Sequence, residues 1–89
     1  MLNLAALTEI HDAWTNVVLA EALFVEDKCK EATDALLAAQ SHYQQARSAV
    51  TIGQTDSTLD KLEDLKVRLN QLRFAIKMKS GTLERHAGQ

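Results

Sequence analysis

The sequence contains no proline and only three glycines, Gly53, Gly81 and Gly88. Both residue types interrupt helices, proline because it lacks the amide proton and glycine because it loses much conformational entropy on folding. The first glycine is at position 53, so residues 3–51 form one uninterrupted stretch composed mostly of good helix formers. The sequence therefore predicts an all-α fold with long helices.

Cysteine is almost absent as well. Cys29 is the only one, which excludes a small secreted fold held by internal disulfide bonds and favours a reducing, cytoplasmic location. Its place within a helical pattern predicts a buried and unreactive thiol. No histidine is near it in the sequence and nothing suggests an oxyanion hole, so we expect no nucleophilic enzyme.

An excess of one charge and a long apolar run are also missing. Ten lysines and arginines against twelve acidic residues give a net charge of −2, which provides no general attraction to nucleic acid. The apolar run 17–25 is interrupted by Glu21 and is less than half of the ~20 residues that span a bilayer. The first residues lack the basic segment of a signal peptide. We therefore expect no membrane association.

The chain is nevertheless apolar enough to fold, with 46% hydrophobic residues among its 89. A domain of this size buries only about 60–65% of the surface of its unfolded chain, so its core is marginal unless a second chain contributes. We expect a single helical domain over residues 1–80, a flexible tail over residues 81–89, and a homo-oligomer.

Two apolar rows with alternating steps of four and three, the spacing of a heptad repeat, run through the first stretch. The first row is Leu4, Leu7, His11, Trp14 and Val18, and the second is Val25, Cys29, Ala32, Leu36, Ala39, Tyr43, Ala46 and Val50. Joining them requires an extra four-residue step near Ala22, a stutter that a continuous helix tolerates. His11 is then expected to be partly buried.

Turn and capping residues are concentrated at 52–58 and predict the interhelical loop, with Asp56 or Ser57 as the N-cap of the next helix. A leucine row with regular heptad spacing follows. It consists of Leu62, Leu65, Leu69, Leu72 and Ile76. Gly81 is the expected C-cap, so this helix is predicted to cover residues 57–80.

Two architectures fit these patterns. In the first, a helix over residues 3–51, about 70 Å long, folds back against the helix over 57–80 as a helical hairpin with coiled-coil-like packing, completed by oligomerisation. In the alternative, the first stretch bends near residues 26–28 and three helices form a bundle. Because no glycine, proline or N-cap pair supports a break there, the sequence favours the hairpin.

Candidates for chemistry are few. The histidines His11, His42 and His86 have no second histidine, and no Glu-x-x-His spacing, on their own helical faces, so we expect no metal, no cofactor and no catalytic site. The second helix carries a row of basic residues. They are Arg68, Arg73, Lys77, Lys79 and Arg85. This row suggests an alternative function, a dimeric regulator that binds nucleic acid.

Apolar residues outside the main rows point to protein binding instead. Val67, Phe74 and Met78 lie opposite the leucine row, where the helix that covers the leucines cannot reach them. With Leu7, Trp14, Val18 and Phe24 of the first stretch, they are our candidate interface residues. We expect a non-enzymatic adaptor, co-chaperone or inhibitor that binds a protein partner. The general form resembles the helical-hairpin co-chaperones of bacterial type III secretion and the short antiparallel bundle proteins of plasmids and phages.

Overall fold

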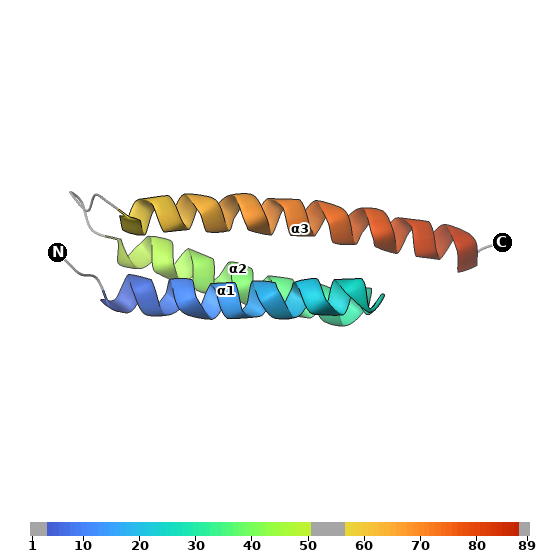
Figure 1. Cartoon of the computed structure of the whole chain (residues 1–89), viewed down its shortest axis with the longest axis horizontal. Helices are drawn as coiled ribbons and strands as arrows, with labels where there is room; N and C mark the ends of the chain where they lie inside the picture. The colour runs from blue at the N-terminus through green and yellow to red at the C-terminus, as the bar shows by residue number, and fades with distance from the viewer. Residues whose placement is uncertain (1–3, 51–56, 88–89) are drawn as a thin grey trace.

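A computed structural model of the chain describes residues 4–50 and 57–87, and the side chains of this part up to Gly81. Three helices pack together: α1 (Leu4–Val25), α2 (Cys29–Ala49) and α3 (Ser57–Ala87). Consecutive helices run antiparallel, so α1 and α3 are parallel (Figure 1). The described residues include no strand and no helix that is long and apolar enough to cross a bilayer. The expectation of an all-α fold is confirmed.

The expected continuous helix over residues 3–51 is wrong, because the chain reverses at residues 26–28. Asp27 has a positive φ of 65° there. The amide of Asp27 donates to the carbonyl of Phe24 at 3.1 Å, and that of Lys28 to Leu23 at 2.9 Å. This pair of hydrogen bonds is the Schellman motif, with Asp27 where glycine is usual. The break lies where the alternative architecture placed a bend.

Small side chains form the contact between α1 and α2. The buried residues of α1 are Ala6, Ile10, Ala13, Val17 and Ala20. Those of α2 are Ala32, Ala35, Leu36, Ala39, Tyr43 and Ala46. The row predicted for α2 is thus buried from Ala32 to Ala46, whereas Val25 before it is 75% exposed. Because helix separation depends on the side chains at the contact, these alanines allow the two backbones to approach closely.

The row predicted for α1 is wrong by one residue. The buried positions are 6, 10, 13 and 17, each of which lies one residue before a predicted position, 7, 11, 14 or 18. One residue rotates a position by about 100° around the helix, so the His11 side chain is 82% exposed instead of partly buried. Leu4 and Val18, at the ends of the predicted row, are 67% and 64% exposed.

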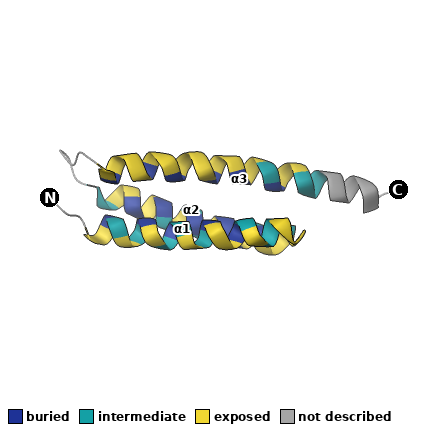
Figure 2. Ribbon diagram, in the orientation of Figure 1, coloured by how far each residue is buried: buried dark blue, intermediate teal, exposed yellow. Residues whose placement is uncertain are grey.

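The leucine row of α3 is confirmed, since all five of its residues are buried against α1 and α2 (Figure 2). Helix α3 begins at Ser57, as predicted, but it continues through Gly81 to Ala87 rather than ending at residue 80. Asp56 and most of the predicted loop lie outside the described residues. The flexible tail predicted for residues 81–89 stays a prediction.

Candidate protein-interaction surface

The outer face of α3, defined by Val67, Phe74 and Met78, carries large apolar side chains in solvent. These side chains are 47%, 66% and 57% exposed. Steps of seven and four residues keep them on one side of the helix, and the leucine row occupies the opposite side. The helix therefore has two apolar sides, of which α1 and α2 cover only one.

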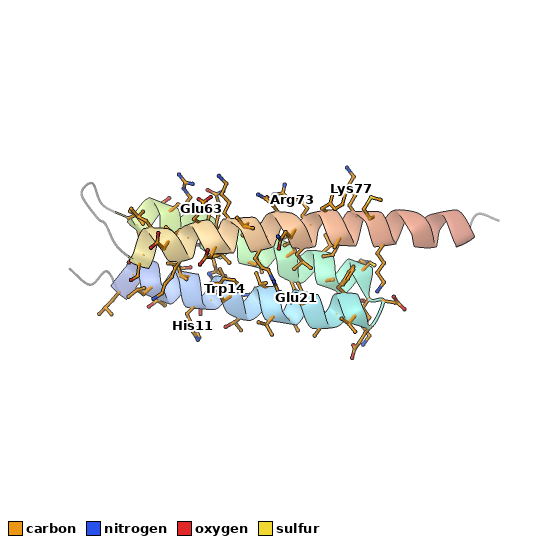
Figure 3. All side chains as sticks on the ribbon, turned by 45° about the horizontal axis from the view of Figure 1, so that its top comes forward. His11, Trp14, Glu21, Glu63, Arg73 and Lys77 are labelled. Atoms are coloured by element: carbon orange, nitrogen blue, oxygen red, sulfur yellow. The ribbon has the colours of Figure 1, made fainter. Side chains whose placement is uncertain are left out.

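An ion pair with α1 helps to hold α3 in this orientation. Arg68 donates from Nε and from a terminal guanidinium nitrogen to the two Glu21 oxygens, both at 2.8 Å. This bidentate hydrogen bond, together with the charge of Glu21, raises the pKa of Arg68 above its usual range. Glu21 lies on the side of α1 that is turned toward α3 (Figure 3). The Arg68–Glu21 contact therefore links α3 to α1 near the middle of the leucine row.

A second tie joins α3 to the turn between α1 and α2. Lys79 Nζ donates to the carbonyl oxygen of Phe24 at 2.6 Å and lies 2.6 Å from Asp27 Oδ1. The same ammonium group is 4.3 Å from the centre of the Phe24 ring. The Phe24 carbonyl also accepts from the Asp27 amide, so Lys79 is its second donor, and a cation at the C-terminus of a helix interacts favourably with the helix dipole. Lys79 therefore acts as a cap for α1, provided by α3.

Among the described side chains of α3, the acidic ones all precede Val67, whereas exposed basic residues occur in both halves, Lys61 and Lys66 included. Asp60, Glu63 and Asp64 precede Val67, and Arg73 and Lys77 lie on either side of Phe74 in the sequence. These three acidic and two basic side chains are exposed. Acidic residues near the N-terminus and basic residues farther along match the helix dipole. Glu63, Arg73 and Lys77 extend from the side of α3 that is turned away from α1 (Figure 3).

The interface residues predicted in α1 are divided between two environments. Trp14 and Phe24 are half-buried and pack against the common core, and Trp14 lies on the side of α1 that faces α3 (Figure 3). Leu7 is half-buried, whereas Val18 points to solvent. The role of these four residues in an interface stays a prediction. Leu19 of α1 and Leu37 of α2, which are 50% and 57% exposed, were not among the predicted interface residues.

An open groove runs between α2 and α3. Leu37, Gln40 and Gln44 line it from α2, and Lys66, Asn70 and Arg73 from α3. At the end nearest Ser57, Arg47 and Glu63 lie on its two walls. A hydrogen bond to the Tyr43 hydroxyl and, as a smaller effect, the charge of Glu63 raise the pKa of Arg47. Most of the side chains that line the groove are polar and exposed.

A polar cluster joins α1 to α2 on the side away from this groove. His42 Nδ1 lies 2.6 Å from Glu9 Oε2, and Gln45, with its amide oriented as a donor, reaches both Glu9 oxygens at 3.1 and 3.2 Å. Asp12 brings a third potential metal-ligand atom within 4.8 Å of the other two. Glu9 is already engaged by two side chains of α2, so we interpret the cluster as an interhelical contact.

The exposure of the Cys29 side chain differs from the prediction of a buried thiol. Cys29 is the first residue of α2 and is partly exposed rather than buried. Its carbonyl accepts a hydrogen bond from the Thr33 hydroxyl at 2.8 Å. Cys29 follows directly on the turn between α1 and α2, away from the outer face of α3. The candidate site of this protein is therefore an apolar, charge-bordered helix face.

Comparisons with protein-family models, with curated proteins and with solved structures found no match to this chain.

Proposed function

We propose that this protein is a non-enzymatic protein-binding module that uses the outer face of α3 as its docking surface. The observation that supports this most directly is the exposure of Val67, Phe74 and Met78 on one side of a helix whose other side is already packed. Contiguous apolar surface bordered by polar residues is typical of protein-interaction sites. Small helical adaptors, co-chaperones and inhibitors bind in this manner.

The ties that hold α3 also support the proposal. Binding costs less when the contact residues are already in place, because less conformational freedom is lost. The Glu21–Arg68 and Lys79–Phe24 contacts fix α3 along its length. Phe74, between these two ties in the sequence, has an aromatic ring of the kind that anchors interfaces. We therefore expect Phe74 to provide the largest part of the binding energy.

A photo-cross-linker tests this proposal. With p-benzoylphenylalanine in place of Phe74 and the full chain expressed in its native cells, irradiation should attach the chain to a protein. The matched control carries the same group in place of Gln44, an exposed residue of α2. The proposal fails if position 74 forms no more protein adducts than position 44.

Nucleic-acid binding by the basic side of α3 is the alternative from the sequence, and it has less support. Arg68 and Lys79, two of the five basic residues in that row, form ion pairs with α1 and the turn. A nucleic-acid complex would also weaken steeply as salt increases, whereas binding through apolar side chains would not. The salt dependence of complex formation therefore separates the two functions.

A further inference from the structure

We infer that the outer face of α3 binds a second copy of the same chain, with the two α3 helices antiparallel and related by a two-fold axis near Asn70. This inference rests on the proposed function and names its partner. The argument depends on the order of apolar and charged residues along α3, and on their exposure.

The charges of this face are complementary to themselves when one helix is reversed. Glu63 and Lys77 are each seven residues from Asn70, so they lie on the same edge of the face as Asn70. A two-fold axis near Asn70 places Glu63 of one copy beside Lys77 of the other, and repeats the pair on the other side of the axis. The same reversal brings Val67 of one copy near Phe74 of the other. Every copy thus provides both halves of each contact.

A parallel pair lacks this complementarity. In a parallel pair equal positions lie at the same height along the two helices, so Glu63 of one copy is level with the acidic residues 60–64 of the other and Lys77 is level with basic residues of the other, and like charges at close range are unfavourable. Within one chain these two residues are about 21 Å apart along the helix, so they cannot pair with each other. Both side chains are exposed, and both lie on the edge of α3 next to α2, where they line the grooves between these helices. The antiparallel orientation is the one that the charges select.

Sedimentation equilibrium of the purified full chain at low salt, over micromolar to millimolar concentrations, tests the inference. The wild type should dimerise. Glu63→Lys and Lys77→Glu should each weaken dimerisation about fivefold or more, since each converts two attractive pairs of the antiparallel dimer into repulsive ones. In a parallel dimer each change would place the new charge level with opposite charges of the partner, so neither change would weaken dimerisation. An equimolar mixture of the two variants should recover association, because opposite charges meet again between the two chains.

Other results would overturn the inference. A wild-type chain that sediments only as a 9.9 kDa species has no such dimer. Variants that dimerise as the wild type does, or a mixture that associates no better than its components, would exclude the antiparallel pairing. Phe74→Glu offers a second route, because an exposed residue can be changed without unfolding the chain, and it should weaken dimerisation about tenfold or more.

A folding control for each variant and the cross-linking result at position 74 separate the possible explanations. The circular dichroism and thermal midpoint of each variant, taken in dilute solution, must match those of the wild type, because Glu63 also faces Arg47 across the groove. If the chain is monomeric but the cross-linker at position 74 attaches it to a different protein, the proposed function stands and this inference fails. A cross-linked product of two copies supports both.

Discussion

Replacement of Leu65 with alanine should be among the most destabilising single changes in this protein. Leu65 is fully buried in the middle of the leucine row, between Leu62 and Leu69, and belongs to the core cluster that all three helices share. Leu→Ala changes at buried sites cost about 3–5 kcal/mol, because the transfer energy of the lost methyl groups is added to the cost of the cavity. The ties at Arg68 and Lys79 limit how far α3 can move to fill that cavity.

The expected loss is large compared with the whole stability of the fold. At about 0.05–0.15 kcal/mol per residue, a chain of 89 residues has a free energy of unfolding of about 4–13 kcal/mol. A loss of about 3 kcal/mol should lower the thermal midpoint by about 12–24 °C. Leu37→Ala is the matched control, because Leu37 is 57% exposed, and it should cost less than about 0.5 kcal/mol.

Urea unfolding followed by circular dichroism, at several protein concentrations, measures both changes. The series of concentrations is needed because self-association adds to the apparent stability. If Leu65→Ala cost less than about 1 kcal/mol, or no more than Leu37→Ala, the packing of α3 against α1 and α2 would be wrong.

Two further changes test how the turn is held. Lys79→Met should lower the free energy of unfolding by about 1–2 kcal/mol, because it removes both the cap of α1 and the ion pair between Lys79 and Asp27. The control, Lys61→Met, changes an exposed position of the same helix and should alter the free energy of unfolding little. Equal effects of both in urea unfolding would disprove the capping role. Asp27→Ile should lower the free energy of unfolding by about 1–2 kcal/mol, because a β-branched side chain disfavours a positive φ. Asparagine tolerates a positive φ, so Asp27→Asn should lower the free energy of unfolding by less than about 1 kcal/mol. A thermal midpoint that is higher for the isoleucine variant than for the asparagine variant would contradict the left-handed turn.

The leucine row of α3 could be predicted because large residues at heptad spacing identify a buried helix side without further information. The row of α1 could not, because Leu7, Trp14 and Val18 lie beside the core, while three of the five buried positions are alanine and only Ile10 and Val17 carry larger side chains. Alanine carries little hydrophobic signal, and its burial is decided by how closely a neighbouring helix approaches. A search for apolar side chains therefore selected positions one residue away from the correct row.

The helix boundaries failed for a related reason. The turn at residues 26–28 contains no glycine or proline, and Asp27 adopts a conformation that the sequence rules assign mainly to glycine. Conversely, Gly81 was expected to end α3, but a glycine within a helix costs only about 1 kcal/mol, which neighbouring interactions can offset. The outer face of α3 was predicted because its residues follow a regular spacing of their own.

The two kinds of buried contact in this protein limit its sequence variation in opposite directions. At Ala13 or Ala39, where two helices meet through alanine, every substitution except glycine adds atoms to a filled space. Along the leucine row, replacement by a smaller residue removes atoms and leaves a space empty. The α1–α2 pair thus accepts change only up to a maximum side-chain size, and α3 only down to a minimum. A sequence designed onto this fold would have to keep the side chains of the α1–α2 contact small and those of the leucine row large.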